Sequence, residues 1–135
     1  MAGYSGTPLA KKLGIKNGSR VFAPGAVKHY GALLGPLPAG AALVPRLSAE
    51  TDIVHLFATR RRVLADALKS IRSRMRDDAA IWVSWPKKSS KMATDITEDT
   101  IRAAGFPLGL VDIKVCAVDE VWSGLKLVVR KELRT

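Results

Sequence analysis

The residues best suited to bind an anion lie between Lys87 and Lys91. This short segment carries three lysines and two serine hydroxyls, and it follows an apolar run that ends at Trp85-Pro86. Open α/β sheets bind ligands at the carboxyl ends of parallel strands, and a helix that begins nearby would add free N–H groups. The pattern predicts a site for a small anion of the phosphate or sulfate type, although a solvated lysine loop would have the same composition. The candidate residues are Lys87, Lys88, Ser89, Ser90 and Lys91.

A second group of cations lies on the polar side of residues 60–76. The apolar residues of this segment recur at helical spacing, which predicts an amphipathic helix with its charged residues in solvent. A cationic helix face can lie along a nucleic-acid backbone, but no nucleic-acid-binding motif and no interleaved aromatic residue accompanies it. A simple solvated face is the alternative. The basic residues on related turns are Arg62, Lys69, Arg72 and Arg76.

Residues with catalytic chemistry are few and widely spaced. His55 lies inside an apolar run, which favours a buried, hydrogen-bonded role, whereas His29 is expected at the surface of a weak helical segment. Ser84 and Cys116 each lie on an expected strand, where plain packing explains them. No spacing assigns a base to either nucleophile or builds a set of metal ligands. The residues alone therefore assign no catalytic group, no metal and no cofactor.

Residues 110–130 contain two β-type runs joined by an acidic turn, which predicts a hairpin. Asp112, Lys114 and Cys116 are two residues apart, so we expect them on one strand face. Trp122 lies beside the turn and would be either a lid over the core or an anchor for a partner. Because an edge hairpin can pair with another chain, a homodimer is one expectation.

The composition is that of a basic globular protein. The chain has 135 residues, 47% of them apolar, and its 22 lysines and arginines against 12 acids give a net charge of +10. Such a charge attracts phosphates or nucleic acid, but it is also found on merely soluble proteins. We expect a cytoplasmic location, because no apolar stretch is long enough for a membrane span, the N-terminus lacks a signal-peptide pattern and there is one cysteine.

Expected strands alternate with expected helices along the chain. This order predicts an α/β fold, a small Rossmann-like three-layer domain over residues 1–135, with a mainly parallel sheet and a C-terminal antiparallel hairpin. Asp95 and Glu98 form a capping-box pattern that predicts a helix over residues 96–104 and would occupy its N-terminus. The other expected helices cover residues 8–13, 26–34 and 60–76, and the expected strands cover residues 19–23, 42–47, 52–58, 79–85, 110–118 and 121–130.

Three segments resemble a family of small bacterial Rossmann-like proteins with no assigned function. They are SGTPLAKKLGIKNGSRV near the start, WVSWPKKSSKMATDIT in the middle and GLVDIKVCAVDEVWSGLKLVVR at the end. The order of elements is distantly similar to a shortened S-adenosylmethionine-dependent methyltransferase fold. The resemblance implies a fold, but it brings no substrate and no catalytic residues.

The sequence departs from the methyltransferase pattern where that fold binds its cofactor. A glycine-rich turn should follow the first strand, but residues 22–26 read FAPGA, with one glycine. An acid should end the second strand, but residues 44–46 read VPR. We therefore predict a non-catalytic binding or interaction module, with an anion bound at the loop after the WVSW strand. Two alternatives stay open: a divergent methyltransferase-like enzyme, and a nucleic-acid-binding protein that uses the basic helix face.

Overall fold

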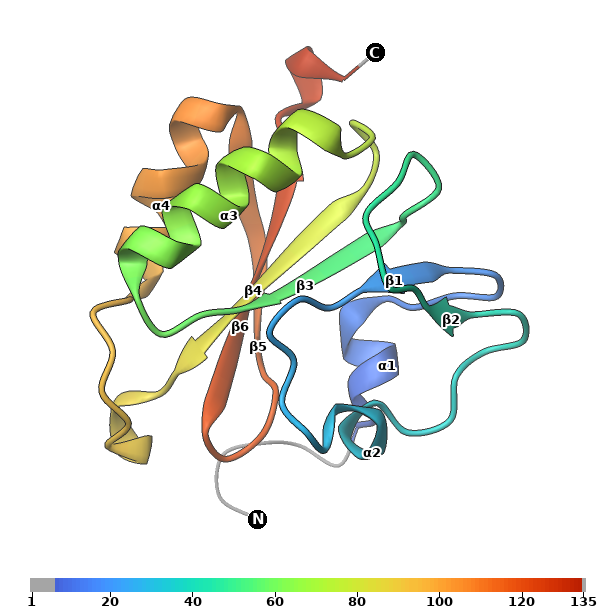
Figure 1. Ribbon diagram of the computed structural model, residues 1–135, viewed down its shortest axis with the longest axis horizontal. Helices are drawn as coiled ribbons and strands as arrows, with labels where there is room; N and C mark the ends of the chain where they lie inside the picture. Colours follow the sequence, from blue (N-terminus) through green and yellow to red (C-terminus); the bar gives the residue numbers. More distant parts are fainter. Residues whose placement is uncertain (1–6, 135) are drawn as a thin grey trace.

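The computed structural model describes residues 7–134 and contains a six-stranded sheet in the order β2-β1-β3-β4-β6-β5 (Figure 1). The first four strands run parallel to one another, and β6 is antiparallel to both β4 and β5. The mainly parallel sheet with a C-terminal antiparallel hairpin is confirmed. The strands are β1 (Arg20–Phe22), β2 (Ala42–Leu43), β3 (Ile53–Phe57), β4 (Ala80–Pro86), β5 (Leu110–Ala117) and β6 (Trp122–Val129).

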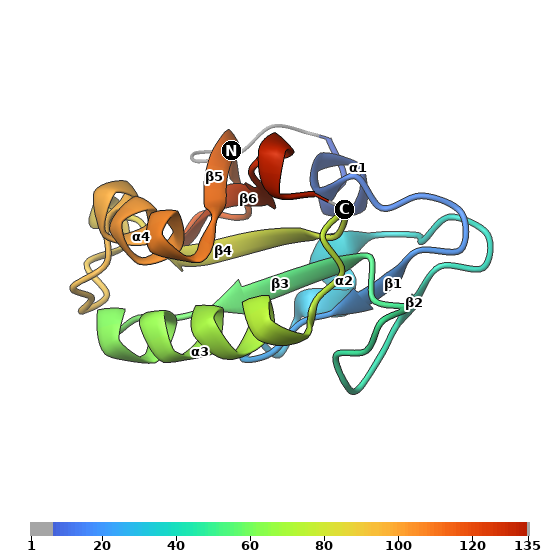
Figure 2. The same ribbon diagram turned by 90° about the horizontal axis from the view of Figure 1, so that it is seen from above.

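Helices cover both faces of the sheet, which confirms the three-layer architecture. The helices α3 and α4 lie side by side on one face, and α1 and α2 pack on the other (Figures 1 and 2). The α-helices are α1 (Leu9–Leu13), α2 (Tyr30–Leu34), α3 (Arg61–Arg74) and α4 (Glu98–Gly105). Three short 3₁₀ helices follow β4, α4 and β6, and they cover Lys88–Ser90, Phe106–Leu108 and Lys131–Leu133.

The central strands β3 and β4 divide their side chains between two apolar cores. Val54 and Leu56 of β3 face α3 and α4, whereas Ile53 and Phe57 face α1 and α2. Successive side chains of a strand point to opposite faces, so a strand covered by helices on both sides must be apolar throughout. This requirement explains why the run over residues 52–58 does not alternate between apolar and polar residues.

Two elements on the β1 side are shorter than the sequence predicts. The strand expected over residues 42–47 pairs only over Ala42–Leu43, just before Pro45, which has no N–H to donate. The helix expected over residues 26–34 begins only at Tyr30. The residues before it form a turn in which Gly25 has a φ of +74°, a conformation outside the helical region.

The predicted capping box of α4 is wrong, because Asp95 caps a different helix. The box at α4 consists of Thr97 and Thr100, whose side chains each accept a hydrogen bond from the other residue's backbone N–H. Asp95 Oδ1 instead accepts from the backbone N–H of Arg61, 2.6 Å away, at the first turn of α3. The loop after β4 is thereby fastened to the start of α3.

The predicted sharing of one face by Asp112 and Lys114 is also wrong. The register of β5 shifts between these residues, so that Asp112 lies opposite Leu127 while Lys114 lies opposite Lys126. The extra residue of this β-bulge is Ile113, and it places the two charged side chains on opposite faces. Asp112 accepts a hydrogen bond from Arg102 of α4, whereas Lys114 lies on the α1 side.

The described residues contain no helix that is long and apolar enough to cross a membrane. The N-terminal segment without a signal-peptide pattern begins in residues 1–6, which lie outside the described residues.

Candidate functional site

The carboxyl edge of the parallel strands is the place where this fold gathers loops. The strand order reverses between β1 and β3, and in open α/β sheets ligands bind outside the carboxyl ends of the strands at such a switch point. Because β6 is antiparallel to β4 and begins opposite Pro86, the hairpin tip lies at the same edge. The segments that meet there cover residues 23–29, 58–60, 87–95 and 118–121.

The turn after β1 folds back onto the end of β3. The backbone N–H of Phe57 donates to the carbonyl of Pro24 at 3.2 Å. A Cβ atom on Gly25 would lie 3.0 Å from the carbonyl oxygen of Phe57, so no larger residue fits there without a shift. The chain itself therefore fills part of the crevice between β1 and β3.

His29 and Asp119 come together at this edge although they are 90 residues apart in the chain. His29 Nε2 lies 3.3 Å from Asp119 Oδ2. The side chain of His29 is 58% exposed, whereas that of Asp119 is only 12% exposed. Asp119 Oδ1 accepts from the backbone N–H groups of Val121 and Trp122, at 2.8 and 2.7 Å, which fixes the carboxylate.

This pair can perform proton transfer. When Asp119 accepts from Nε2–H, the neutral imidazole of His29 carries its lone pair on Nδ1. Among residues 7–134, Nδ1 has no hydrogen-bond partner, so a substrate group can reach it. An acid that orients an exposed histidine is one arrangement that supports general-base catalysis.

A second chain of polar groups is buried in the core and begins at Tyr30, the residue that follows His29. Tyr30 Oη lies 2.8 Å from His55 Nδ1, and His55 Nε2 lies 2.7 Å from Ser84 Oγ. Burial lowers the pKa of His55 to about 3, so its ring is neutral, and burial raises the pKa of Tyr30. The predicted role of His55 as a buried, hydrogen-bonded core residue is confirmed. Because all three side chains are buried, this chain is closed to a substrate.

The lysine loop predicted as an anion site is only partly available to a ligand. Lys87 Nζ donates to the carbonyl of Asp119 at 2.7 Å, which ties the loop to the hairpin tip. Ser90 Oγ donates to the carbonyl of Lys87 within a 3₁₀ turn. Lys88, Ser89 and Lys91 are exposed.

The predicted basic face of α3 is divided by local ion pairs. Arg72 lies 3.2 Å from Asp77, and Arg76 lies 2.7 Å from Asp52. Each arginine also donates to a backbone carbonyl of a neighbouring segment. Arg62 and Lys69 are exposed and have no ion pair among residues 7–134.

Trp122 is a lid over the core. Only 9% of the residue is exposed, and its ring packs edge-on against Phe57 with centroids 5.2 Å apart. This packing fits the first of its two predicted roles, and the role of interface anchor stays a prediction.

The His29–Asp119 pair was not predicted from the sequence. The available signal was the turn residue Asp119 itself, because an aspartate at that position often accepts from the N–H two residues on. The missing information was the register that places the hairpin tip beside the loop after β1.

Known proteins resemble this chain in structure but not in sequence. The sequence matches no protein-family model, and no curated protein matches it. A methyltransferase from Aquifex aeolicus superposes on 90% of this chain and 88% of its own, with a TM-score of 0.57 and 14% identity. Fibrillarin from Aeropyrum pernix, solved with natively bound S-adenosylmethionine, matches over 90% of this chain and 72% of its own, with a TM-score of 0.58 and 16% identity. The chain has the fold of the S-adenosylmethionine-dependent methyltransferases.

A third neighbour is the tRNA methyltransferase TrmK of Bacillus subtilis, which matches over 89% of this chain with a TM-score of 0.55 and 9% identity. This chain spans 64% of the length of that enzyme. The prediction of a non-catalytic binding or interaction module is wrong, because two of these neighbours are methyltransferases and the third was solved with bound S-adenosylmethionine, which favours the alternative of a divergent methyltransferase-like enzyme. The predicted distant similarity to the methyltransferase fold is confirmed.

The residues at the carboxyl edge do not form the usual cradle for the cofactor of this fold. The turn after β1 has one glycine, and its Cα faces the carbonyl of Phe57 instead of an open crevice. The chain after β2 continues with Val44, Pro45 and Arg46 and offers no acid for ribose hydroxyls. S-adenosylmethionine would need other contacts here.

Proposed function

We propose that this chain is a divergent methyltransferase-like enzyme with its reaction site at the carboxyl edge of the sheet. The observation that carries the proposal is the superposition of 89% to 90% of the chain on two methyltransferases. A second observation supports it independently of the comparisons. The edge at which this fold places ligands also carries His29 and Asp119, 3.3 Å apart.

In the proposed reaction, His29 accepts a proton from the substrate. A hydroxyl or amine that gains a methyl group must lose its own proton, and Nδ1 of His29 is free to take it. Asp119 holds the ring in the required tautomer and stabilises the imidazolium that forms. Lys87 helps to fix Asp119 through the backbone carbonyl of that residue.

The expected methyl donor is S-adenosylmethionine, which is proposed from the fold alone. Because the glycine-rich turn and the acid after β2 are missing, we expect weak binding. The dissociation constant should lie between about 10 µM and 1 mM, or roughly −7 to −4 kcal/mol. We also propose that the protein is located in the cytoplasm.

Calorimetric titration with S-adenosylhomocysteine, the demethylated product, tests the proposal. We expect saturable binding in the stated range, and weaker binding by Gly25→Ala because that substitution displaces the turn after β1. Gly14→Ala is a matched control, since Gly14 also has a positive φ, of +80°, but lies in open space away from this edge. Absence of binding at roughly twice the weakest expected dissociation constant would contradict the proposal.

A further inference from the structure

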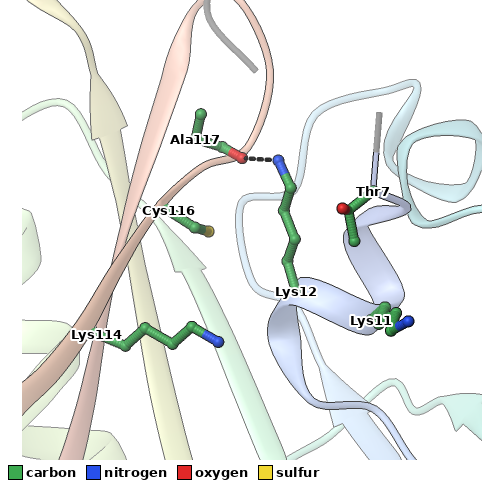
Figure 3. Close-up of a pocket in the computed structure, with 6 residues that line it drawn as sticks. All are labelled: Thr7, Lys11, Lys12, Lys114, Cys116 and Ala117. Carbon is green, nitrogen blue, oxygen red and sulfur yellow. Dashed lines mark hydrogen bonds between the residues drawn. The ribbon is translucent and has the colours of Figure 1, made fainter. Parts of the chain in front are cut away.

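A groove lined by lysines lies between α1 and the outer strand β5 (Figure 3). It has a volume of about 530 Å³ and is open to solvent. The side chains of Lys12 and Lys114 approach it from opposite walls, and Cys116 lies on the same wall as Lys114. Lys12 Nζ donates to the carbonyl of Ala117 at 2.9 Å. The lining residues are Thr7, Lys11, Lys12, Lys114, Cys116 and Ala117.

Two of the lysines on this face are direct cross-strand neighbours. Lys114 of β5 pairs with Lys126 of β6, because the bulge at Ile113 turns Lys114 to the α1 side. Like charges opposite each other on a sheet destabilise it. Burial and the nearby charges of Lys114 and Lys16 lower the pKa of Lys126. The repulsion between these lysines therefore destabilises the fold, and a bound anion would relieve this repulsion.

Four of the lysines on this face lack an acidic partner among residues 7–134. Lys11, Lys16, Lys114 and Lys126 form no ion pair with any residue in the range 7–134. Asp52 and Asp78 line an adjoining pocket with Lys16 and Lys126, but Arg76 binds both carboxylates. The described lining of the groove itself carries lysines and no acid, whereas the adjoining pocket holds acids as well as cations.

The lysines are spread along the sheet and do not converge on one point. Thr7 and Ala117 mark the end of the groove near the hairpin tip, at the carboxyl edge. Lys16 and Lys126 line the adjoining pocket together with Ala80, the first residue of β4, towards the opposite edge. An array of this kind matches an anion with several spaced charges better than a single phosphate.

We propose that this groove binds the phosphate backbone of a single-stranded nucleic acid. Among residues 7–134, the walls of the groove contain no aromatic side chain on which a base could stack, so recognition by these walls would depend on phosphates and not on sequence. Binding requires no methyl donor. If the proposed function also holds, the groove leads the bound nucleic acid towards His29, and nucleic acid is the substrate class. This statement about the substrate rests on the proposed function.

Fluorescence anisotropy with a labelled 12-nucleotide RNA, without methyl donor, tests the groove. With four lysine–phosphate contacts, from Lys11, Lys16, Lys114 and Lys126, the logarithm of the association constant should fall against the logarithm of the salt concentration with a slope of about −2.8. The variant Lys114→Gln/Lys126→Gln should reduce the slope to about −1.4 and weaken binding about tenfold at low salt. Arg62→Gln/Lys69→Gln removes the same charge from exposed residues of α3 and should change binding less than twofold.

The single cysteine reports where the RNA binds. Cys116 lines the groove and is half-buried, so bound RNA should slow its alkylation by a maleimide several-fold, whereas the Lys114→Gln/Lys126→Gln variant should lose this protection. Equal weakening by the two double variants would show that net charge alone drives binding. Competition by inorganic phosphate at an equal phosphate concentration would indicate a small-anion pocket. Either result, or no RNA binding at low salt, would overturn the inference, whatever the outcome with S-adenosylhomocysteine.

Discussion

Replacing Trp82 by alanine is expected to lower the free energy of unfolding by about 4 kcal/mol, within the usual range for a buried tryptophan. Trp82 is fully buried at the centre of the sheet, and its Nε1–H donates to the carbonyl of Leu13 at 3.1 Å. Gly124 on β6 leaves room for its ring, because a Cβ there would lie 3.3 Å from Trp82 Cε3. The substitution thus opens a cavity and also removes the bond that fastens α1 to β4.

Urea unfolding followed by circular dichroism measures this loss. Trp82→Phe retains much of the apolar contact and should cost only about 1 to 2 kcal/mol, mainly through the lost hydrogen bond of the Leu13 carbonyl. Met92→Ala is a surface control, since that side chain is exposed, and should change stability by less than about 0.5 kcal/mol. A loss below about 1 kcal/mol in Trp82→Ala would contradict the docking of α1 on the centre of the sheet.

Lowering the pH from 7 to 4.5 is expected to cost about 3 kcal/mol of stability through His55 alone. The pKa of this buried histidine falls from the usual 6.5 to about 3, so between these values the unfolded chain binds a proton that the folded chain does not. Stability is therefore complete above pH 6.5 and falls by about 1.4 kcal/mol per pH unit below it. The lowered pKa of Asp52 acts with the same sign, but only below its usual value of 3.8.

Unfolding in urea across this pH range tests the expectation. His55→Gln retains a polar group for Tyr30 and Ser84 but cannot titrate. Between pH 7 and 4.5, the variant should therefore lose about 3 kcal/mol less stability than the wild-type protein loses. If that variant does not fold, the ring protons of His55 in the wild-type protein provide the test. Their chemical shifts should stay constant from pH 7 to 4.5, and a titration within this range would show that the ring is not excluded from water.

Local patterns were sufficient to predict most of the fold. The apolar run ending at Phe57 and the apolar stripe of α3 specify a strand buried on both faces and the helix that covers one of them. The predictions are wrong where a contact with a distant segment decides the local structure. Asp95 has the local pattern of a cap for α4, but the start of α3 lies within hydrogen-bond distance of its carboxylate.

The candidate site depends even more on contacts between distant segments. His29 and Asp119 gain their chemistry from each other, and only the antiparallel register of β6 brings the hairpin tip to the loop after β1. The lysine groove depends on the bulge at Ile113, which strict alternation along β5 cannot predict. The sequence shows only a weak likeness to methyltransferases, because the cofactor-binding motifs are missing. The order of the strands is retained, and it is recognised in the structure.

The most direct measurement of the central claim is an NMR titration of the ¹⁵N-labelled protein with S-adenosylhomocysteine. If the chain is a methyltransferase-like enzyme, backbone amide signals should shift for residues 23–29, 58–60 and 118–121, which meet at the carboxyl edge. Residues of α3 that face solvent should not respond. Unchanged spectra at roughly 2 mM ligand, or shifts confined to surfaces away from that edge, would contradict the proposed function.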